Sequence, residues 1–209
     1  MTKPLNGVNL GGWLVLEKWM VPSVFKGSEA INEYELSRTK NGKEAIKRHH
    51  ETFITEKDII WLKNHQIDIV RIPVGYWVLD GADGYVQAKK QLDWLFEVTK
   101  KHSIKLLLCL HAAPGAQNNN DHSGSGRPGP VGWYHSNNRR RTRKILVKLA
   151  KRYGSYRHLW GIELLNEPVA ITKKQRRQMW WWVNWTKLRL RMILPRKVKI
   201  IYSDCYDPQ

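Results

Sequence analysis

An apolar segment that ends in an amide, a carboxylic acid and a proline suggests a proton donor. Residues 159–168 read Leu-Trp-Gly-Ile-Glu-Leu-Leu-Asn-Glu-Pro. Proline donates no backbone hydrogen bond and restricts the residue before it, so a strand here is expected to stop at Asn166 or Glu167. A carboxyl group at a strand end, with an amide beside it, is suited to general acid chemistry. Asn-Glu-Pro alone is a weak signal, so its meaning depends on the residues at the ends of the other strands.

Polar and aromatic residues also lie at the ends of the other predicted strands. They are Trp13 and Glu17 after the first, Arg71 and Tyr76 at the second, and His111 and Asp121 after the third. Aromatic rings can stack on the apolar faces of a sugar, and charged or amide groups can bind its hydroxyls. The combination at one edge of a sheet indicates a polyhydroxyl ligand.

Each of these residues also has an ordinary structural explanation. Arg71 could form a structural ion pair, His111 could be a hydrogen-bonded histidine at the sheet edge, and Asp121 could belong to a turn. The tryptophans at 180–182 and 185 fall within one predicted helix, so we expect them to pack in the core rather than to form a sugar platform.

Short apolar runs alternate with amphipathic stretches along the chain. The apolar runs predict strands at residues 7–10, 67–72, 104–110, 159–165 and 198–203, and Pro73 is expected to stop the second strand. The amphipathic stretches predict helices at residues 55–64, 89–102, 139–153 and 175–193, with further helix within 33–53. Thr55 and Asp58 form a capping-box pattern at the start of one helix. Strict alternation predicts an α/β fold with a parallel sheet and right-handed crossovers. In such folds the chemistry collects at the carboxyl ends of the strands.

The chain carries a formal net charge of +18 over 209 residues, and the excess is concentrated in its second half. Between Arg139 and Lys199 there are nineteen Lys and Arg residues against only Glu163 and Glu167. Because these cations alternate with apolar positions, we expect them on the solvated faces of helices. An anionic polymer is the alternative partner, but no nucleic-acid-binding module is present, so no nucleic acid is expected.

Several other classes of protein are not indicated. No apolar run approaches the roughly 18 residues that a membrane span requires, and no signal peptide is visible at the N-terminus. Cys109 and Cys205 are too few for a disulfide framework and are expected to be reduced, packed thiols. No spacing indicates a metal or an organic cofactor, so neither is expected.

Four ordered blocks of the chain, residues 7–17, 71–77, 111–118 and 165–168, form a combined pattern. Together they resemble glycoside hydrolase family 5, and most closely its exo-β-1,3-glucanase-type branch. The resemblance implies a TIM (β/α)8-barrel, of which this chain would supply about five strands. It also implies hydrolysis of β-glucosidic bonds with retention of configuration, on a β-glucan for which β-1,3 linkages are expected. Residues 1–209 would then form a single partial catalytic domain.

The resemblance also implies roles for individual residues. Glu167 matches the proton donor, whose pKa must be lifted toward the working pH. The substrate-binding positions that the resemblance and the strand-end pattern indicate are Trp13, Glu17, Arg71, Tyr76, His111, Asp121 and Asn166.

The sequence also departs from the family. A barrel of eight strands takes about 250 residues, and no residue here matches the family's glutamate nucleophile at the seventh strand. His122 replaces a common asparagine. Among substitutes, Glu163 lies about 13 Å from Glu167 along a strand, and Asp204 would attack from an unsuitable direction.

We therefore expect activity to be strongly reduced or absent in this chain alone. The alternatives are a non-catalytic carbohydrate-binding fragment and a half-barrel that a partner completes. Unpaired strands at both edges of such a sheet would favour self-association. Relatives are commonly exported, whereas no export signal is visible, so the sequence assigns no compartment.

Overall fold

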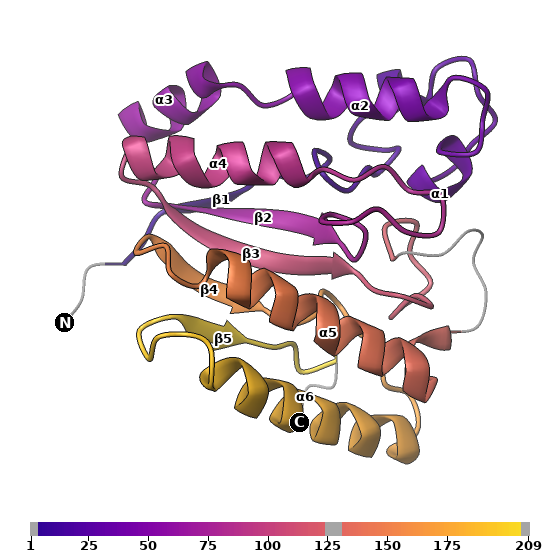
Figure 1. The fold of residues 1–209 in the computed structure, drawn as a ribbon. Coiled ribbons are helices and arrows are strands. Elements are labelled where there is room, and N and C mark those ends of the chain that lie inside the picture. Colours follow the sequence, from indigo (N-terminus) through magenta and orange to yellow (C-terminus); the bar gives the residue numbers. More distant parts are fainter. Residues whose placement is uncertain (1–3, 124–130, 206–209) are drawn as a thin grey trace.

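The sheet has five parallel strands whose spatial order is the order of the chain. The computed structural model describes residues 4–123 and 131–205. The strands are β1 (Gly7–Asn9), β2 (Ile69–Gly75), β3 (Lys105–Ala112), β4 (Leu159–Glu163) and β5 (Lys199–Ile201), each paired with the next (Figure 1). A doubly wound sheet reverses its strand order at a switch point. The unbroken order is that of a barrel arc, and it confirms the predicted parallel α/β fold.

Helices connect the strands as the alternating pattern predicts. They are α1 (Glu33–Leu36), α2 (Gly42–Thr52), α3 (Glu56–Asn64), α4 (Lys89–Lys101), α5 (Ser136–Tyr153) and α6 (Lys173–Arg191), with short 3-10 turns η1 (Pro22–Phe25) and η2 (Gly132–Tyr134). The predicted capping box at the start of α3 is present, and the Asp58 carboxylate accepts the Thr55 N–H at 2.8 Å. Leu92, Leu95 and Phe96 form the buried face of α4.

The core lies between the sheet and the helices that cover it. Val70, Ile72 and Val74 of β2 and Leu106, Leu108 and Leu110 of β3 are fully buried, and they pack in one cluster with residues of α4, α5 and α6. A smaller cluster around η1, α1 and α2 includes Leu16, Phe25 and Ile46. This second cluster supports the long segment after β1, which carries Glu17 to the sheet edge.

The expectation that Pro73 would stop the second strand is wrong. β2 continues through Pro73 to Gly75, and Pro73 lies opposite Cys109 of β3. The Arg71 carbonyl accepts the Leu10 N–H, so the backbone polar groups of Arg71 point toward β1. Because the direction of these groups alternates along a strand, the backbone nitrogen of Pro73 points to the same side. Because β1 ends at Asn9, opposite Arg71, the missing donor of Pro73 leaves no ladder bond unmade.

Other element ends are shifted by a few residues. β4 ends at Glu163, earlier than expected, although the Leu164 and Asn166 N–H groups still donate to Ile201 and Leu110. α6 begins at Lys173, because Thr172 and Gln175 form a capping box that sets its start.

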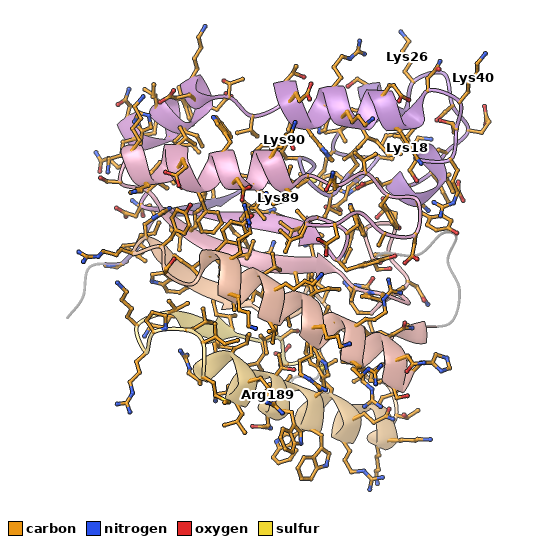
Figure 2. All side chains as sticks on the ribbon, in the orientation of Figure 1. Lys18, Lys26, Lys40, Lys89, Lys90 and Arg189 are labelled. Carbon is orange, nitrogen blue, oxygen red and sulfur yellow. The ribbon has the colours of Figure 1, made fainter. Side chains whose placement is uncertain are left out.

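Basic side chains lie on several helices, among them Lys89 and Lys90 of α4 and Arg189 of α6 (Figure 2). α5 and α6 contain no acidic residue. Acidic groups elsewhere pair with part of the α5 charge, as in the ion pair of Arg152 with Asp93 at 2.6 Å.

The tryptophans of α6 do not all pack in the core. Trp182 is buried, and its indole N–H donates to the Arg139 carbonyl, whereas Trp180, Trp181 and Trp185 are more than half exposed. The expectation of core packing is therefore wrong for those three. Cys109 is buried and Cys205 partly buried, and the two are not joined in a disulfide. Of the helices in the described ranges, none has the length and apolar character of a membrane span.

Candidate active site

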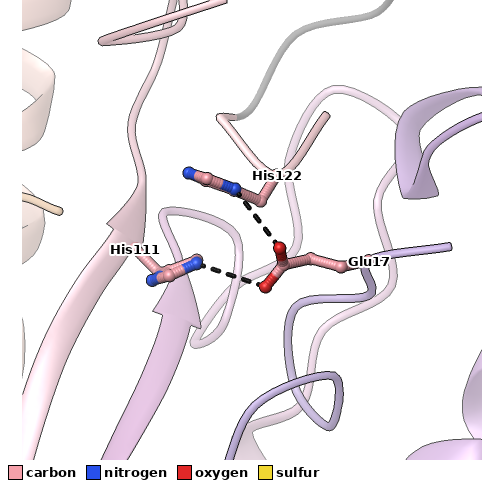
Figure 3. Close-up of side chains that lie close together, drawn as sticks. All are labelled: Glu17, His111 and His122. Atoms are coloured by element: carbon pink, nitrogen blue, oxygen red, sulfur yellow. Dashed lines mark ion pairs between the residues drawn. The ribbon is translucent and has the colours of Figure 1, made fainter. Parts of the chain in front are cut away.

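Glu17, His111 and His122 meet at the carboxyl end of the sheet. Glu17 follows β1, His111 lies near the end of β3, and His122 comes from the loop after β3. The Glu17 carboxylate reaches Nε2 of His111 at 3.6 Å and Nδ1 of His122 at 3.5 Å (Figure 3). The two imidazole rings lie side by side, with centroids 4.5 Å apart.

The two histidines keep the Glu17 carboxyl ionised. The side chain is only 14% exposed, and burial by itself would raise its pKa, but the contacts with His111 and His122 outweigh burial and hold the pKa well below its usual range. Burial in turn lowers the pKa of His111. A buried carboxylate of this kind is suited to accept hydrogen bonds from sugar hydroxyls.

A second buried carboxyl group fixes the backbone just before Glu17. Oε2 of Glu33 accepts the N–H of Leu16 at 2.8 Å. Burial raises the pKa of Glu33 to about 8, against its contacts with Leu16 and Trp77. Glu33 therefore acts as a positioning residue for Glu17.

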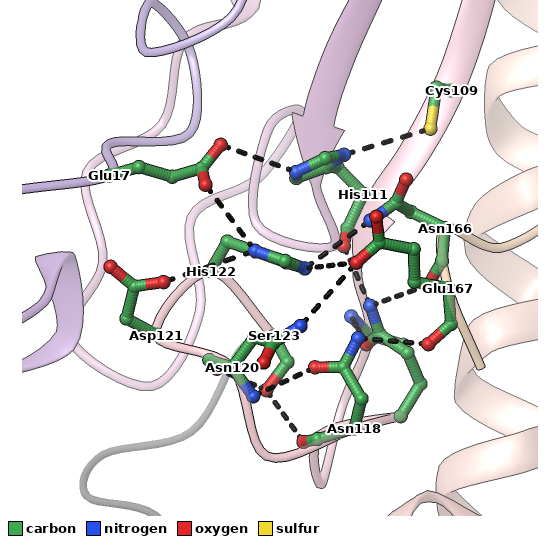
Figure 4. A network of polar contacts seen from close by, with 12 residues as sticks. Glu17, Cys109, His111, Asn118, Asn120, Asp121, His122, Ser123, Asn166 and Glu167 are labelled. Carbon is green, nitrogen blue, oxygen red and sulfur yellow. Dashed lines mark hydrogen bonds and ion pairs between the residues drawn. The ribbon is translucent and has the colours of Figure 1, made fainter. Parts of the chain in front are cut away.

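Glu167 lies on the other side of His122. One carboxylate oxygen lies 3.7 Å from Nε2 of His122 and accepts a hydrogen bond from the Asn120 amide at 3.4 Å (Figure 4). The side chain is 41% exposed, so it can reach a ligand. Glu167 has φ of 44°, a left-handed conformation that costs a non-glycine residue roughly 1 to 3 kcal/mol and often marks a functional site.

Amides from the loop after β3 hold the segment that carries Glu167. The buried Gln117 side chain donates to the carbonyls of His111 at 2.7 Å and Asn166 at 3.0 Å. The Asn118 side chain donates to the Glu167 carbonyl at 2.9 Å. These bonds offset the strain at Glu167 and tie the ends of β3 and β4 together.

Arg71 forms the floor of the site. Its Nε and Nη2 donate to the two oxygens of Glu163 at 2.8 and 2.9 Å, and Nη2 also donates to the Asn166 side chain at 2.8 Å. Burial would lower the pKa of Arg71, but the Glu163 carboxylate raises it above its normal value. The structural ion pair considered for Arg71 is thus present, and both carboxylate oxygens of its partner, Glu163, accept hydrogen bonds from Arg71.

The structure brings together most of the predicted site residues. Glu17, His111, Asn166 and Glu167 form one network around His122 (Figure 4). Arg71 joins it through Asn166, and Asp121 joins it at the edge, with Oδ1 4.0 Å from Nδ1 of His122.

Trp13 and Tyr76 do not join this network. Trp13 is 1% exposed, packs edge-to-face on Trp94, and donates its indole N–H to the His50 carbonyl. Tyr76 is buried beside Trp77, and its hydroxyl donates to Asp83. The prediction that these two rings contact a sugar is corrected: both are held in the protein interior.

Three residues of the site were not among the predicted ligands. Glu33 and Glu163 position Glu17 and Arg71, and no sequence signal marks them, because their partners are distant in the chain. His122 had one signal, the histidine in place of the asparagine common in the family that the sequence resembles.

Comparison with known sequences identifies the family of the chain. The family model described as "Cellulase (glycosyl hydrolase family 5)" matches residues 32–194. A probable glucan 1,3-beta-glucosidase A of Emericella nidulans is 40% identical over 177 residues, which are 80% of this chain and 43% of that protein. A glucan 1,3-beta-glucosidase of Blumeria graminis is 39% identical over 180 residues, 79% of this chain and 41% of that protein. The chain thus spans about two-fifths of the length of these relatives.

Solved structures show the same fold at low sequence identity. AoRut superposes with a TM-score of 0.83 at 21% identity, covering 100% of this chain and 64% of that protein. A rutinosidase from Aspergillus niger gives a TM-score of 0.79 at 21% identity, covering 97% and 63%. The fold is of the TIM-barrel type, and the described strands form part of such a barrel. On the evidence of the family model, the chain belongs to glycosyl hydrolase family 5.

Proposed function

We propose that this chain forms a partial catalytic domain that binds a β-glucan and carries the proton donor for hydrolysis of its β-glucosidic bonds. The names of the similar proteins favour β-1,3 linkages. The observation that carries the proposal is the convergence around His122 of Glu17, which follows β1, with Asn166 and Glu167, which follow β4.

The geometry supports a different role for each of these groups. The ionised Glu17 would accept hydrogen bonds from hydroxyls of the sugar nearest the scissile bond, with Asp121 beside it. The exposed carboxyl of Glu167 would protonate the glycosidic oxygen. Arg71 would act through Asn166, whose side chain it holds at 2.8 Å.

Retaining hydrolysis also needs a carboxylate nucleophile about 5 Å from the acid. Of the described carboxylates in the network, Glu17 is engaged by two histidines and Glu163 by Arg71. We therefore expect binding of oligosaccharide with little or no turnover by this chain alone. The same observation favours the second candidate function, a carbohydrate-binding fragment.

The test uses the full chain, with laminari-oligosaccharides and an aryl β-glucoside as ligands. Calorimetric titration should show binding that Glu17→Gln weakens at least tenfold. Any residual release of aryl product should fall by about 10² to 10⁴ in Glu167→Gln, the usual contribution of a general acid. Glu44→Gln, at an exposed carboxylate on α2, is the matched control and should change neither quantity.

Two results would contradict the proposal. One is a folded chain that binds none of these oligosaccharides. The other is turnover that persists unchanged in Glu167→Gln.

A further inference from the structure

The cluster of Glu17, His111 and His122 has the dimensions of a metal site. One ligand atom from each residue lies within 4.8 Å of the others; Oε1 of Glu17 is 3.6 Å from His111, and Oε2 is 3.5 Å from His122. Ligands at 2.0 to 2.1 Å from a tetrahedral zinc ion lie about 3.4 Å apart. The ligand atoms must therefore move closer together to bind a common ion.

The contacts within the protein leave this cluster incompletely satisfied. His111 is 8% exposed, and its Nε2, which is directed at Glu17, is buried without a hydrogen-bond partner. A buried polar atom without a partner is costly. A cation between the three side chains would give this nitrogen a partner, next to a carboxylate that already accepts the Trp19 indole N–H at 3.0 Å.

Groups around the cluster bear on how it would bind a cation. If Nδ1 of His122 binds the ion, Nε2 carries the proton and lies 3.7 Å from the Glu167 carboxylate, and the Asn166 amide nitrogen, 3.3 Å from Nε2, has to turn away from it. Nδ1 of His111 lies 3.9 Å from the sulfur of Cys109. Histidine ligands of metals commonly donate their second nitrogen to a carboxylate or another acceptor, which fixes the tautomer and the ring orientation.

We propose that Glu17, His111 and His122 bind a divalent transition-metal ion of the zinc class. Two imidazoles and one carboxylate form a typical protein donor set for Zn²⁺, with a fourth position left for water. The proposal goes beyond the glycosidase function. Because the ion would use the Glu17 oxygens that the sugar is proposed to use, zinc and oligosaccharide should compete.

The experiment measures zinc binding by the full chain after treatment with chelator and dialysis. Competition with a chromophoric chelator should give one Zn²⁺ per chain, and Co²⁺ should give the visible absorption of a low-coordinate site. His122→Asn and Glu17→Gln should each weaken zinc binding by more than about 100-fold, because removal of even an outer-shell group costs 10- to 100-fold.

His102→Asn is the matched control, since His102 pairs with the exposed Glu56 at 2.7 Å without a second histidine. It should leave zinc binding unchanged, and circular dichroism should show that all variants are folded. Equal zinc affinity in the wild type and in either folded site variant would overturn the proposal, as would an equal loss in His102→Asn. Oligosaccharide binding by the metal-free chain is a separate measurement, so the two proposals can fail independently.

Discussion

Glu33 is a buried carboxyl group that holds the backbone before Glu17. It accepts the Leu16 N–H, while its other oxygen is buried without a hydrogen-bond partner. Burial raises its pKa from 4.5 to about 8, so the folded chain retains a proton that the unfolded chain releases between these pH values. The contribution of Glu33 to stability is therefore fully present below pH 4.5 and is lost as the pH rises toward 8.

Glu33→Gln should remove this dependence. A glutamine carbonyl can still accept the Leu16 N–H but does not ionise, so the free energy of unfolding of the variant should improve relative to wild type as the pH rises from 5 to about 8.5. Urea unfolding across this range measures the difference. Glu51→Gln, at an exposed position on α2, should show no such trend, and a parallel pH profile for Glu33→Gln would refute the coupling.

Some site residues could be predicted because they lie at strand ends. The proximity of Glu17, His111 and Glu167 could be predicted in this way, since parallel strands present their carboxyl ends at one edge. Trp13 was misassigned because strand position does not fix which way a loop side chain points, and this indole turned inward to His50. Glu33 gave no signal, because its role depends on a contact across 17 residues of chain.

At the scale of elements, α6 depends on a capping box at its start. Oγ1 of Thr172 accepts the Gln175 N–H at 3.1 Å, and the Gln175 side chain accepts the Thr172 N–H at 3.0 Å. The Thr-x-x-Gln spacing is visible in the sequence, whereas the periodicity alone predicts a start at Gln175. Pro73 likewise predicts a strand end, because the sequence does not show that β1 stops pairing with β2 before Pro73.

Thr172→Ala should lower the free energy of unfolding by about 1 kcal/mol, because it leaves helix N–H groups of α6 without their acceptor. Chemical denaturation measures the change. The control is Thr52→Ala at the exposed end of α2, where the hydroxyl bonds the Arg48 carbonyl and caps nothing. That change should stay within about 0.5 kcal/mol, and an equal loss in both variants would argue against the cap.

For the molecule as a whole, the edges of the sheet are the feature with the largest consequence. In the described ranges neither β1 nor β5 has a second partner strand. Unpaired edges promote association, whereas the net charge of +18 opposes it. The parallel direction of the strands was predictable from alternation, and the family resemblance implied their order in a barrel. The meeting of residues as distant as Glu17 and Glu167 at His122 required the folded sheet.

We expect self-association that increases with salt, because salt screens repulsion between chains. Sedimentation velocity measured between about 0.05 and 0.5 M NaCl tests this. The electrostatic screening length is roughly 10 Å at 0.1 M and becomes shorter as the salt concentration rises. The Ile201 carbonyl faces β4, so the N–H of Ile200 faces the open side, and Ile200→Pro should reduce association. Association lost only in Trp185→Ser would assign it to the α6 surface instead.

The agreement between strand order and chain order also bears on how the protein is made. During synthesis β2 can pair with β1, and each later strand can join the edge formed just before it, without waiting for a distant segment to emerge. The sheet would therefore grow at one edge only. When β4 joins it, Glu167 would reach the carboxyl end of the sheet, where Glu17 and His111 already lie. On the ribosome, the acid is the last of these three groups to arrive.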